Sequence, residues 1–193
     1  GGVRTRQVTG RNTPSVINSV FNVRNFWDGR ARQTFTGLTP FGESDTGANV
    51  LAYRDGELVA EHVRVENSSL ASQGNGPALN EVEMSYAGRD WLQLGRKLLN
   101  LPPLARQKVA ADDSVLGAMA NPDGNGLMGD VSYGSMIEAA FKPEYWSAPQ
   151  GDAAYSQMER NFPLYWGLAL QAYQATLVSD DSRFDRFQEG DRE

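Results

Sequence analysis

The chain has 193 residues, of which 40% are hydrophobic and 22% are charged, and its net charge is −6 at pH 7. These values indicate a globular protein with a substantial core and argue against a general nucleic-acid binder. The absence of cysteine excludes disulfides, iron–sulfur clusters and covalently attached haem within these residues, and a single histidine, His62, excludes a multi-histidine metal site.

No apolar stretch approaches the roughly 20 residues that are needed to cross a bilayer. No basic segment followed by an apolar one opens the chain. The sequence therefore predicts neither a membrane span nor a signal peptide within these residues. Both ends would suit loops cut from a longer polypeptide, so we expect the chain to be the middle of a larger protein.

The first elements predicted along the chain are short. Thr13 as a cap and Pro14 at a first helical position predict a short helix running through Val20. Residues 33–50 are rich in Gly, Thr, Ser and Asp and predict a loop. The segment from Val50 to Val65, which contains an Asp-Gly turn, predicts a β-hairpin.

The second half of the chain is predicted to be mostly helical. Apolar residues at helical spacing indicate a helix from Asp90 to Leu101, which a pair of prolines ends. Shorter helices are expected at 114–119 and 132–141. The strongest predicted helix, 154–177, carries a wide apolar stripe, and Pro163 either kinks it or marks its true first turn.

Two neighbouring motifs near the start of the chain carry the most information. The first is Arg11-Asn12-Thr13-Pro14-Ser15, and the second is Phe26-Trp27-Asp28-Gly29-Arg30-Ala31. The aromatic pair beside an acid, a glycine and an arginine fits a tryptophan whose body is packed and whose edge is held by polar neighbours. Together the two motifs resemble the signature of the bacterial di-haem cytochrome c peroxidase and MauG family.

The resemblance extends over most of the chain. The segment from Ser69 through Gln73 and Gly76-Pro77 to Met84 resembles the distal wall of the family's peroxidatic haem pocket. The segment from Ala175 to Phe187 resembles the helix end before the second haem domain. The resemblance implies an all-α, cytochrome c-like peroxidatic domain over residues 1–193, with an inserted loop and β-hairpin at about 32–67.

The resemblance also implies a role for each of five residues. Asn12 matches a ligand of the calcium ion between the two haem domains, and Trp27 matches the tryptophan between the two porphyrins that relays electrons. Gln73 and Glu83 match the distal pair that handles peroxide, with Glu83 as the acid/base, and Pro77 matches a residue of the pocket wall. A carboxylate suits this proton transfer if a dry pocket raises its pKa, and calcium prefers oxygen ligands.

The family's haem attachment motif, Cys-x-x-Cys-His, is missing. In the family one copy lies upstream of the position of Arg11 and another just downstream of Phe187, and this chain has neither. We therefore expect two haem c groups attached outside these residues, and a chain that is inactive alone. His62, in the inserted hairpin, is predicted to be an exposed strand residue and not a haem ligand. The loop from Asn121 to Ser132 resembles an EF-hand loop but lacks its final Glu, and is predicted to be a glycine-rich loop.

Three functions stay open at this point. The first is reduction of hydrogen peroxide to water, with electrons from a second haem and a small redox-protein donor. The second is MauG-like oxidation of a protein or organic substrate, and the third is a haem-free structural or interaction module. The expected partners are the remaining haem-bearing parts of the same protein, the electron donor and a second copy of the chain. The resemblance implies a periplasmic or otherwise exported protein.

Overall fold

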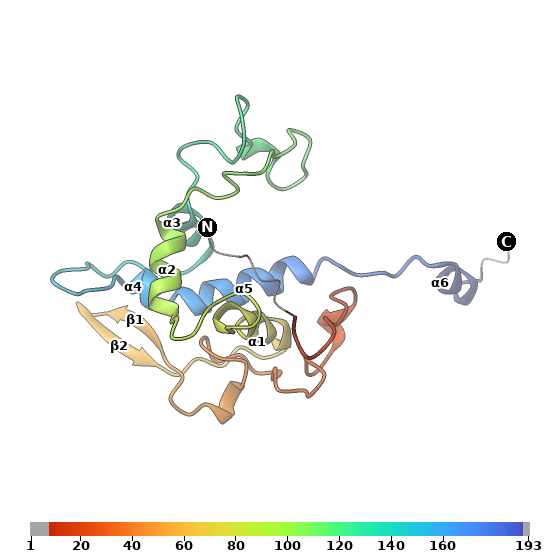
Figure 1. Cartoon of the computed structure of the whole chain (residues 1–193), viewed down its shortest axis with the longest axis horizontal. Helices are drawn as coiled ribbons and strands as arrows, with labels where there is room; N and C mark the ends of the chain where they lie inside the picture. Colours follow the sequence, from red (N-terminus) through yellow and green to blue (C-terminus); the bar gives the residue numbers. More distant parts are fainter. Residues whose placement is uncertain (1–7, 191–193) are drawn as a thin grey trace. The chain divides into compact units, whose positions relative to one another are not determined.

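The computed structural model describes residues 8–190, which form two compact units. Unit 1 comprises the described residues up to Ala48, residues Val63–Ala87, and those from Trp166 onward, and unit 2 comprises Asn49–His62 and Gly88–Tyr165. The α-helices are α1 (Ser69–Gly74), α2 (Trp91–Leu99), α3 (Tyr133–Ala140), α4 (Gln157–Arg160), α5 (Phe162–Gln174) and α6 (Arg183–Gln188) (Figure 1). The strands are β1 (Val50–Arg54) and β2 (Glu57–Glu61), and the 3-10 turns are η1 (Ser19–Phe21), η2 (Gly42–Ser44), η3 (Pro77–Leu79), η4 (Gly117–Met119) and η5 (Pro143–Tyr145).

Unit 1 is built around the close packing of the later turns of α5 against α1. A Cβ atom on Gly167 would lie 2.7 Å from the Phe35 ring and 3.0 Å from the Ala71 carbonyl oxygen, so only glycine allows this approach. The Ala71 backbone N–H donates to the Gln171 side-chain oxygen over 3.0 Å. Phe35 and Ala71 are fully buried, and they place the core of unit 1 at this contact.

In unit 2, β1 and β2 form an antiparallel hairpin, and Arg54 pairs with Glu57 beside the turn. Two polar side chains from the α4 region hold the backbone of β1. The Asn161 side chain accepts from the Leu51 N–H over 2.8 Å and donates to the Leu51 carbonyl over 2.7 Å, and Gln157 donates to the same carbonyl over 2.8 Å. The hairpin is therefore fixed to unit 2 through amides that are themselves buried.

The prediction of an all-α fold is wrong. Helices of all kinds account for 33% of the described residues, and β1 and β2 form a two-stranded sheet (Figure 1). Residues 100–131 show the main physical reason, because their three prolines and four glycines interrupt backbone hydrogen bonding and allow only the short turn η4. A cytochrome c-like fold gains no support from these elements, and the single domain over 1–193 stays a prediction.

Several local predictions are confirmed. The hairpin forms on the Asp55-Gly56 turn, although β2 ends at Glu61 and not at Val65. The helix predicted from Asp90 is α2, and the helix at 132–141 is α3. The segment 33–50 is irregular except for η2, an isolated antiparallel backbone pair of Phe35 with Val65, and the first residue of β1.

Three helix predictions are wrong in extent. The helix expected from Pro14 to Val20 is reduced to η1, because Asn18 takes a left-handed φ of 61°. The helix expected at 114–119 is reduced to η4. The long helix expected at 154–177 is divided into α4 and α5, and Pro163 lies in the first turn of α5, as one of the two alternatives for it predicted. No helix in residues 8–190 is long and apolar enough to span a membrane.

Candidate active site

The Trp27 loop, residues 25–31 of unit 1, is a tight turn closed by an antiparallel backbone pair. The Asn25 N–H donates to the Ala31 carbonyl over 3.1 Å, and the Ala31 N–H donates to the Asn25 carbonyl over 3.3 Å. The chain reverses here because Phe26 and Gly29 take left-handed φ angles of 63° and 66°. This conformation is uncommon for a bulky side chain and persists only where surrounding contacts fix it.

Contacts of Phe26 and Asn25 fix the loop. A Cβ atom on Gly76 would lie 2.8 Å from the Phe26 ring, so the ring lies directly against the backbone there. The Arg30 guanidinium carbon lies 3.9 Å from the centroid of the same ring, which is a cation–π contact. Asn25 is buried and its side-chain amide donates to the Ser69 hydroxyl over 2.9 Å. The Trp27 loop is therefore seated on α1 and on the turn that follows it.

Trp27 lies in this loop with its ring system open. Its side chain is 68% exposed, and its indole N–H donates to the Asn12 carbonyl over 2.7 Å. The prediction that polar neighbours hold the edge of this tryptophan is confirmed. The prediction that its body is packed is wrong, because Phe26 takes the inner position against Gly76. An indole that is fixed at its nitrogen and open on its rings can accept another planar group against it.

Asp28, the next residue, joins two arginines. Its carboxylate accepts from Arg11 over 2.7 Å, from the Arg30 side chain over 2.9 and 3.2 Å, and from the Arg30 backbone N–H over 3.2 Å. The hydrogen bond from Arg11 has the largest effect on the pKa of Asp28, and together with the contacts of Arg30 it lowers that pKa to about 2. The carboxylate is therefore ionised at neutral pH.

The three predicted distal residues follow one another along unit 1. Gln73 lies at the end of α1, its carbonyl accepts from the Gly76 N–H over 3.1 Å, and Pro77 begins η3. Because Gly76 contacts Phe26, the structure brings the segment of Gln73 and Pro77 to the Trp27 loop. Glu83 comes later, in a separate turn.

Asn80 shapes the turn that carries Glu83. Its carbonyl accepts from the Glu83 N–H over 3.2 Å, and its side-chain oxygen accepts from the Val82 N–H over 3.0 Å. Val82 and Met84, on either side of Glu83, are 48% and 62% exposed. No hydrogen bond or ion pair among the described residues engages the Glu83 carboxylate or the Gln73 amide, so both groups are available to a ligand.

Asn12 is the predicted calcium ligand. Its backbone carbonyl receives the Trp27 indole, and within residues 8–190 its exposed side-chain amide makes no hydrogen bond. Among the same residues no group of three or more His, Cys, Asp or Glu side chains could hold a metal ion. Calcium binding at Asn12 therefore stays a prediction.

Two other positions were singled out from the sequence. His62 is exposed as predicted, but it lies just after β2 in unit 2 and not in the strand, because β2 ends at Glu61. In the glycine-rich loop, the Asn121 side chain accepts from the Asp123 N–H over 3.0 Å and donates to the Asn125 carbonyl over 3.2 Å, so it shapes a turn.

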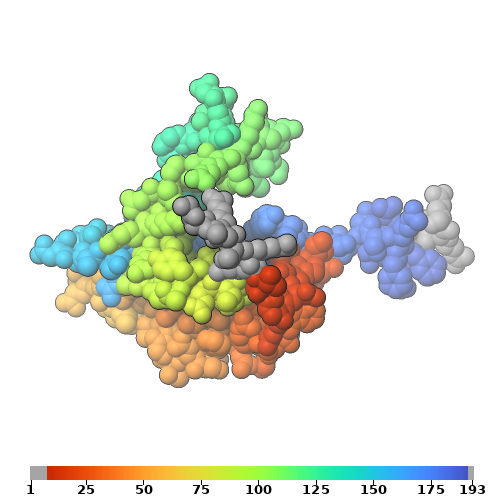
Figure 2. Space-filling model, in the orientation of Figure 1, coloured from red at the N-terminus to blue at the C-terminus, as the bar shows by residue number. Residues whose placement is uncertain are grey.

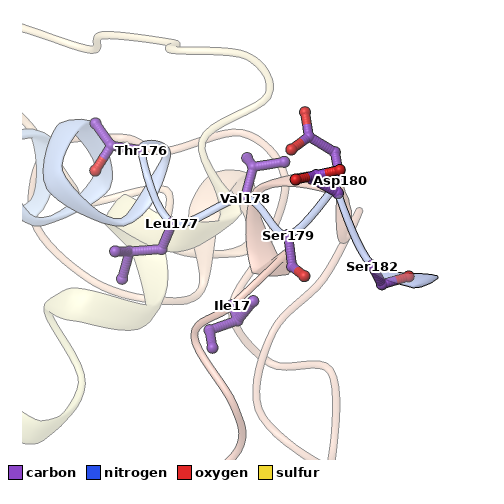
Figure 3. A pocket seen from close by; sticks show the side chains of 8 residues that line it. Ile17, Thr176, Leu177, Val178, Ser179, Asp180 and Ser182 are labelled. Carbon is purple, nitrogen blue, oxygen red and sulfur yellow. The ribbon is translucent and has the colours of Figure 1, made fainter. Parts of the chain in front are cut away.

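A surface cavity of about 440 Å³ in unit 1 lies where the segment after α5 meets Ile17 (Figure 3). Asn18 joins the two segments. Its backbone N–H donates to the Leu177 carbonyl over 2.9 Å, and its side-chain oxygen accepts from the Ser179 N–H over 2.7 Å. This junction anchors the N-terminal segment that supports Trp27. Figure 2, where the early described residues are red, shows part of this segment at the surface.

Sequence reasoning missed two features of the site. One is the contact between Phe26 and Gly76, which joins segments fifty residues apart and leaves no local signal. The other is the link that Asp28 makes between Arg11 and Arg30. A signal for this link was present, because Asp28 is the only acidic residue in the two motifs and the other charged residues there are arginines.

The comparisons with known proteins agree with these motifs. A family model described as di-haem cytochrome c peroxidase matches residues 1–193, the whole chain. No curated protein and no solved structure matches it. The family consists of oxidoreductases that use haem c and is typically periplasmic. Because the match covers the full length, the chain belongs to the di-haem cytochrome c peroxidase family.

Proposed function

We propose that the chain is the haem-free central part of a di-haem c-type cytochrome peroxidase that reduces hydrogen peroxide to water. In this proposal Trp27 relays electrons from one haem, supplied by a small redox-protein donor, to the haem where peroxide is reduced. The observation that carries the proposal is the Trp27 loop, in which a fixed indole presents open ring faces. A merely structural tryptophan is usually largely buried.

The residues present fit the surroundings of haem and not its attachment. The chain has no cysteine for thioether bonds, and its one histidine, His62, belongs to unit 2, whereas Trp27, Gln73 and Glu83 belong to unit 1. We therefore assign the attachment of both haem c groups to residues outside these 193. When bound, haem supplies the iron centre at which peroxide is reduced.

The proposed roles of the chain's own residues follow from their chemistry. Glu83 takes a proton from one peroxide oxygen and delivers it to the other, and the Gln73 amide holds the peroxide by hydrogen bonding. Pro77 forms part of the wall. Two electrons and two protons convert one molecule of peroxide into two of water. The exposed apolar side chains of Val82 and Met84 support this role, because a surface that covers them would also exclude water from Glu83.

The proposal has three further parts. Calcium binds the side-chain oxygen of Asn12, with its other ligands outside the described residues, because an amide carbonyl is the hard donor that calcium prefers. The protein works in the periplasm, where its donor is also located. It assembles with the haem-bearing parts of the same protein and with a second copy of itself.

The first experiment is a denatured intact mass of the protein purified from its native source, together with an absorbance spectrum recorded before denaturation. A haem absorption band with a mass well above 21.2 kDa, or with haem-bearing companion fragments, is the expected result. A single haem-free species of 21.2 kDa would overturn the catalytic proposal and leave the structural or interaction module.

The second experiment measures peroxide turnover by the haem-bearing protein. Trp27→Phe is expected to slow turnover about tenfold or more, while the matched control Trp146→Phe leaves it unchanged. Equal effects of the two substitutions would contradict the relay. A haem-bearing protein that oxidises an added protein or organic substrate, and does not reduce peroxide with a redox-protein donor, would establish the MauG-like function instead.

A further inference from the structure

Two adjacent contacts join residues 11–12 to residues 27–28. The Trp27 indole N–H donates to the Asn12 carbonyl over 2.7 Å, and one residue along each segment the Arg11 guanidinium donates to the Asp28 carboxylate over 2.7 Å. Because the partners are neighbours in both segments, the two contacts lie side by side. A displacement of one contact therefore displaces the other.

The contact of the indole N–H with the Asn12 carbonyl is by itself a weak restraint. It is a single neutral hydrogen bond, and the Trp27 ring is 68% exposed, so little packing opposes its rotation. The contact between Arg11 and Asp28 is charge-assisted and belongs to a network, because Asp28 also accepts from the side chain and the backbone of Arg30. Arg30 in turn covers the Phe26 ring, which lies against Gly76. The network thus fixes the position of Trp27 relative to the turn that follows α1.

We propose that Arg11 and Asp28 are positioning residues that hold the Trp27 indole in a single orientation, with Arg30 as the second anchor of Asp28. The inference rests on the proposed relay function, since a fixed orientation matters only if the ring meets redox partners. Small displacements of a reacting group carry large kinetic costs. The pair contributes little to stability, because its side chains are 58% and 37% exposed and such pairs are worth little in water.

The test follows the Trp27 indole N–H directly by NMR in the chain labelled with ¹⁵N-tryptophan. The four tryptophans should give four indole signals, and Trp27→Phe identifies the signal of Trp27. In Arg11→Gln and in Asp28→Asn we expect this signal to shift and its hydrogen exchange to accelerate about fivefold or more, because the restraint on the hydrogen bond is lost. Arg11→Lys, which keeps the charge, is expected to restore part of the protection.

The matched control is Arg64→Gln. Arg64 pairs with Glu43, also in unit 1, and it is as exposed as Arg11. Its removal should leave the Trp27 signal unchanged. The other three indole signals report in each variant whether the fold is intact. A variant that alters them is replaced by Arg11→Lys, in which we expect the Trp27 indole N–H to exchange faster than in wild type.

Two results would overturn the inference. One is an unchanged Trp27 signal and exchange rate in both Arg11→Gln and Asp28→Asn. The other is an equal effect of Arg64→Gln, which would indicate general loosening of unit 1. The measurement needs no haem, so its outcome is separate from that of the turnover experiment with Trp27→Phe. If Arg11→Gln alters the indole signal but Trp27→Phe leaves turnover unchanged, the pair positions the indole and the relay is absent. If Trp27→Phe slows turnover but Arg11→Gln and Asp28→Asn leave the indole signal unchanged, the relay exists and the pair does not position it.

Discussion

The two units of the molecule share two structural features, a turn with left-handed residues and an arginine–carboxylate pair, but these serve different purposes in each unit. Each contains a tight turn with two left-handed residues, Phe26 and Gly29 in unit 1 and Asp55 and Gly56 in unit 2. Asp-Gly is the expected pair for a two-residue hairpin turn, because both residue types tolerate a left-handed backbone. Phe does not fit this rule. The strained turn is the one that presents Trp27, whereas the relaxed turn only joins β1 to β2.

Each unit also contains an arginine–carboxylate pair with a 2.7 Å contact. In unit 1, Asp28 is exposed and its contacts lead to Trp27. In unit 2, Glu159 is 8% exposed, accepts from Arg96, and also accepts from the Ser156 N–H over 2.7 Å to cap α4. The comparison indicates that the turn and the ion pair of unit 2 stabilise the fold, while the turn and the ion pair of unit 1 set the geometry of the exposed Trp27 side chain.

The largest effect is expected when the pair of the buried Glu159 with the half-exposed Arg96 is broken. Glu159→Gln removes a buried charge that accepts three hydrogen bonds, two from Arg96 and one from the Ser156 N–H, and we expect it to lower the free energy of unfolding by about 2 kcal/mol. Asp28→Asn is the counterpart in unit 1 and should leave the urea midpoint unchanged, because the exposed pair is solvated. Urea unfolding of both variants tests this. A comparable loss in Asp28→Asn would contradict the distinction between the units.

The acid dependence of the same pair sharpens the test. The hydrogen bond from Arg96 has the largest effect on Glu159 and lowers the pKa of its carboxyl below the ordinary value of 4.5. A carboxyl with a lowered pKa in the folded state stabilises the fold fully above its unfolded pKa, and this contribution is lost as pH falls through the folded pKa. The stability advantage of wild type over Glu159→Gln should therefore be complete above pH 4.5 and should shrink as pH falls below that value.

The second largest effect is expected at the seat of the Trp27 loop. Gly76→Ala places a Cβ atom 2.8 Å from the Phe26 ring, which Arg30 restrains on its face. We expect a loss of about 1–2 kcal/mol, as is common for overpacking, together with a change at the Trp27 indole signal. Gly129→Ala, where a Cβ atom would meet nothing within 4 Å, is the control. Equal stability of the two variants would show that Phe26 is free to move.

The elements that could be predicted from the sequence are those with local causes. α2 begins directly after Asp90 because the Asp90 side chain caps it by accepting from the Gln93 N–H over 2.7 Å, and the spacing of apolar residues predicts the helix to within two residues of its end at Leu99. The hairpin follows from Asp55-Gly56. The indole edge of Trp27 is held by a polar partner as its motif indicates, although the motif does not identify the Asn12 carbonyl as that partner.

The elements that could not be predicted have causes far away in the chain. Asn18 interrupts the helix expected from Pro14 because it binds Leu177 and Ser179. Asn161 divides the helix expected at 154–177, and its side chain is engaged with the Leu51 backbone. The exposure of Trp27 likewise depends on the close packing of the Phe26 ring against Gly76. Patterns within one segment carry no information about such contacts.

A smaller effect is expected in the relaxed turn of unit 2. Gly56 has a φ of 86°, and Gly56→Ala should cost about 1 kcal/mol because a Cβ atom disfavours the left-handed region. Asp55→Asn should be neutral, since Asn tolerates the φ of 52° as well as Asp does. Thermal or urea unfolding of the two variants measures both effects. A neutral Gly56→Ala would show that the turn of unit 2 can change its backbone conformation.

The smallest effect on stability, and the most specific to unit 1, is expected in the response of Trp27 to acid. Asp28 keeps its charge down to a pKa of about 2, chiefly because Arg11 donates to it. The sign follows from this lowered pKa: the ion pair is complete above the ordinary value of 3.8 and is lost as pH falls through about 2. The Trp27 indole signal should therefore stay constant from pH 7 to pH 4 and shift only near pH 2. In Asp28→Asn the same signal should already be shifted at pH 7 and show no transition near pH 2, because no carboxylate remains there to titrate. A wild-type transition near pH 4 would show that Asp28 titrates as an unpaired carboxyl, and the pair would then have no part in holding Trp27.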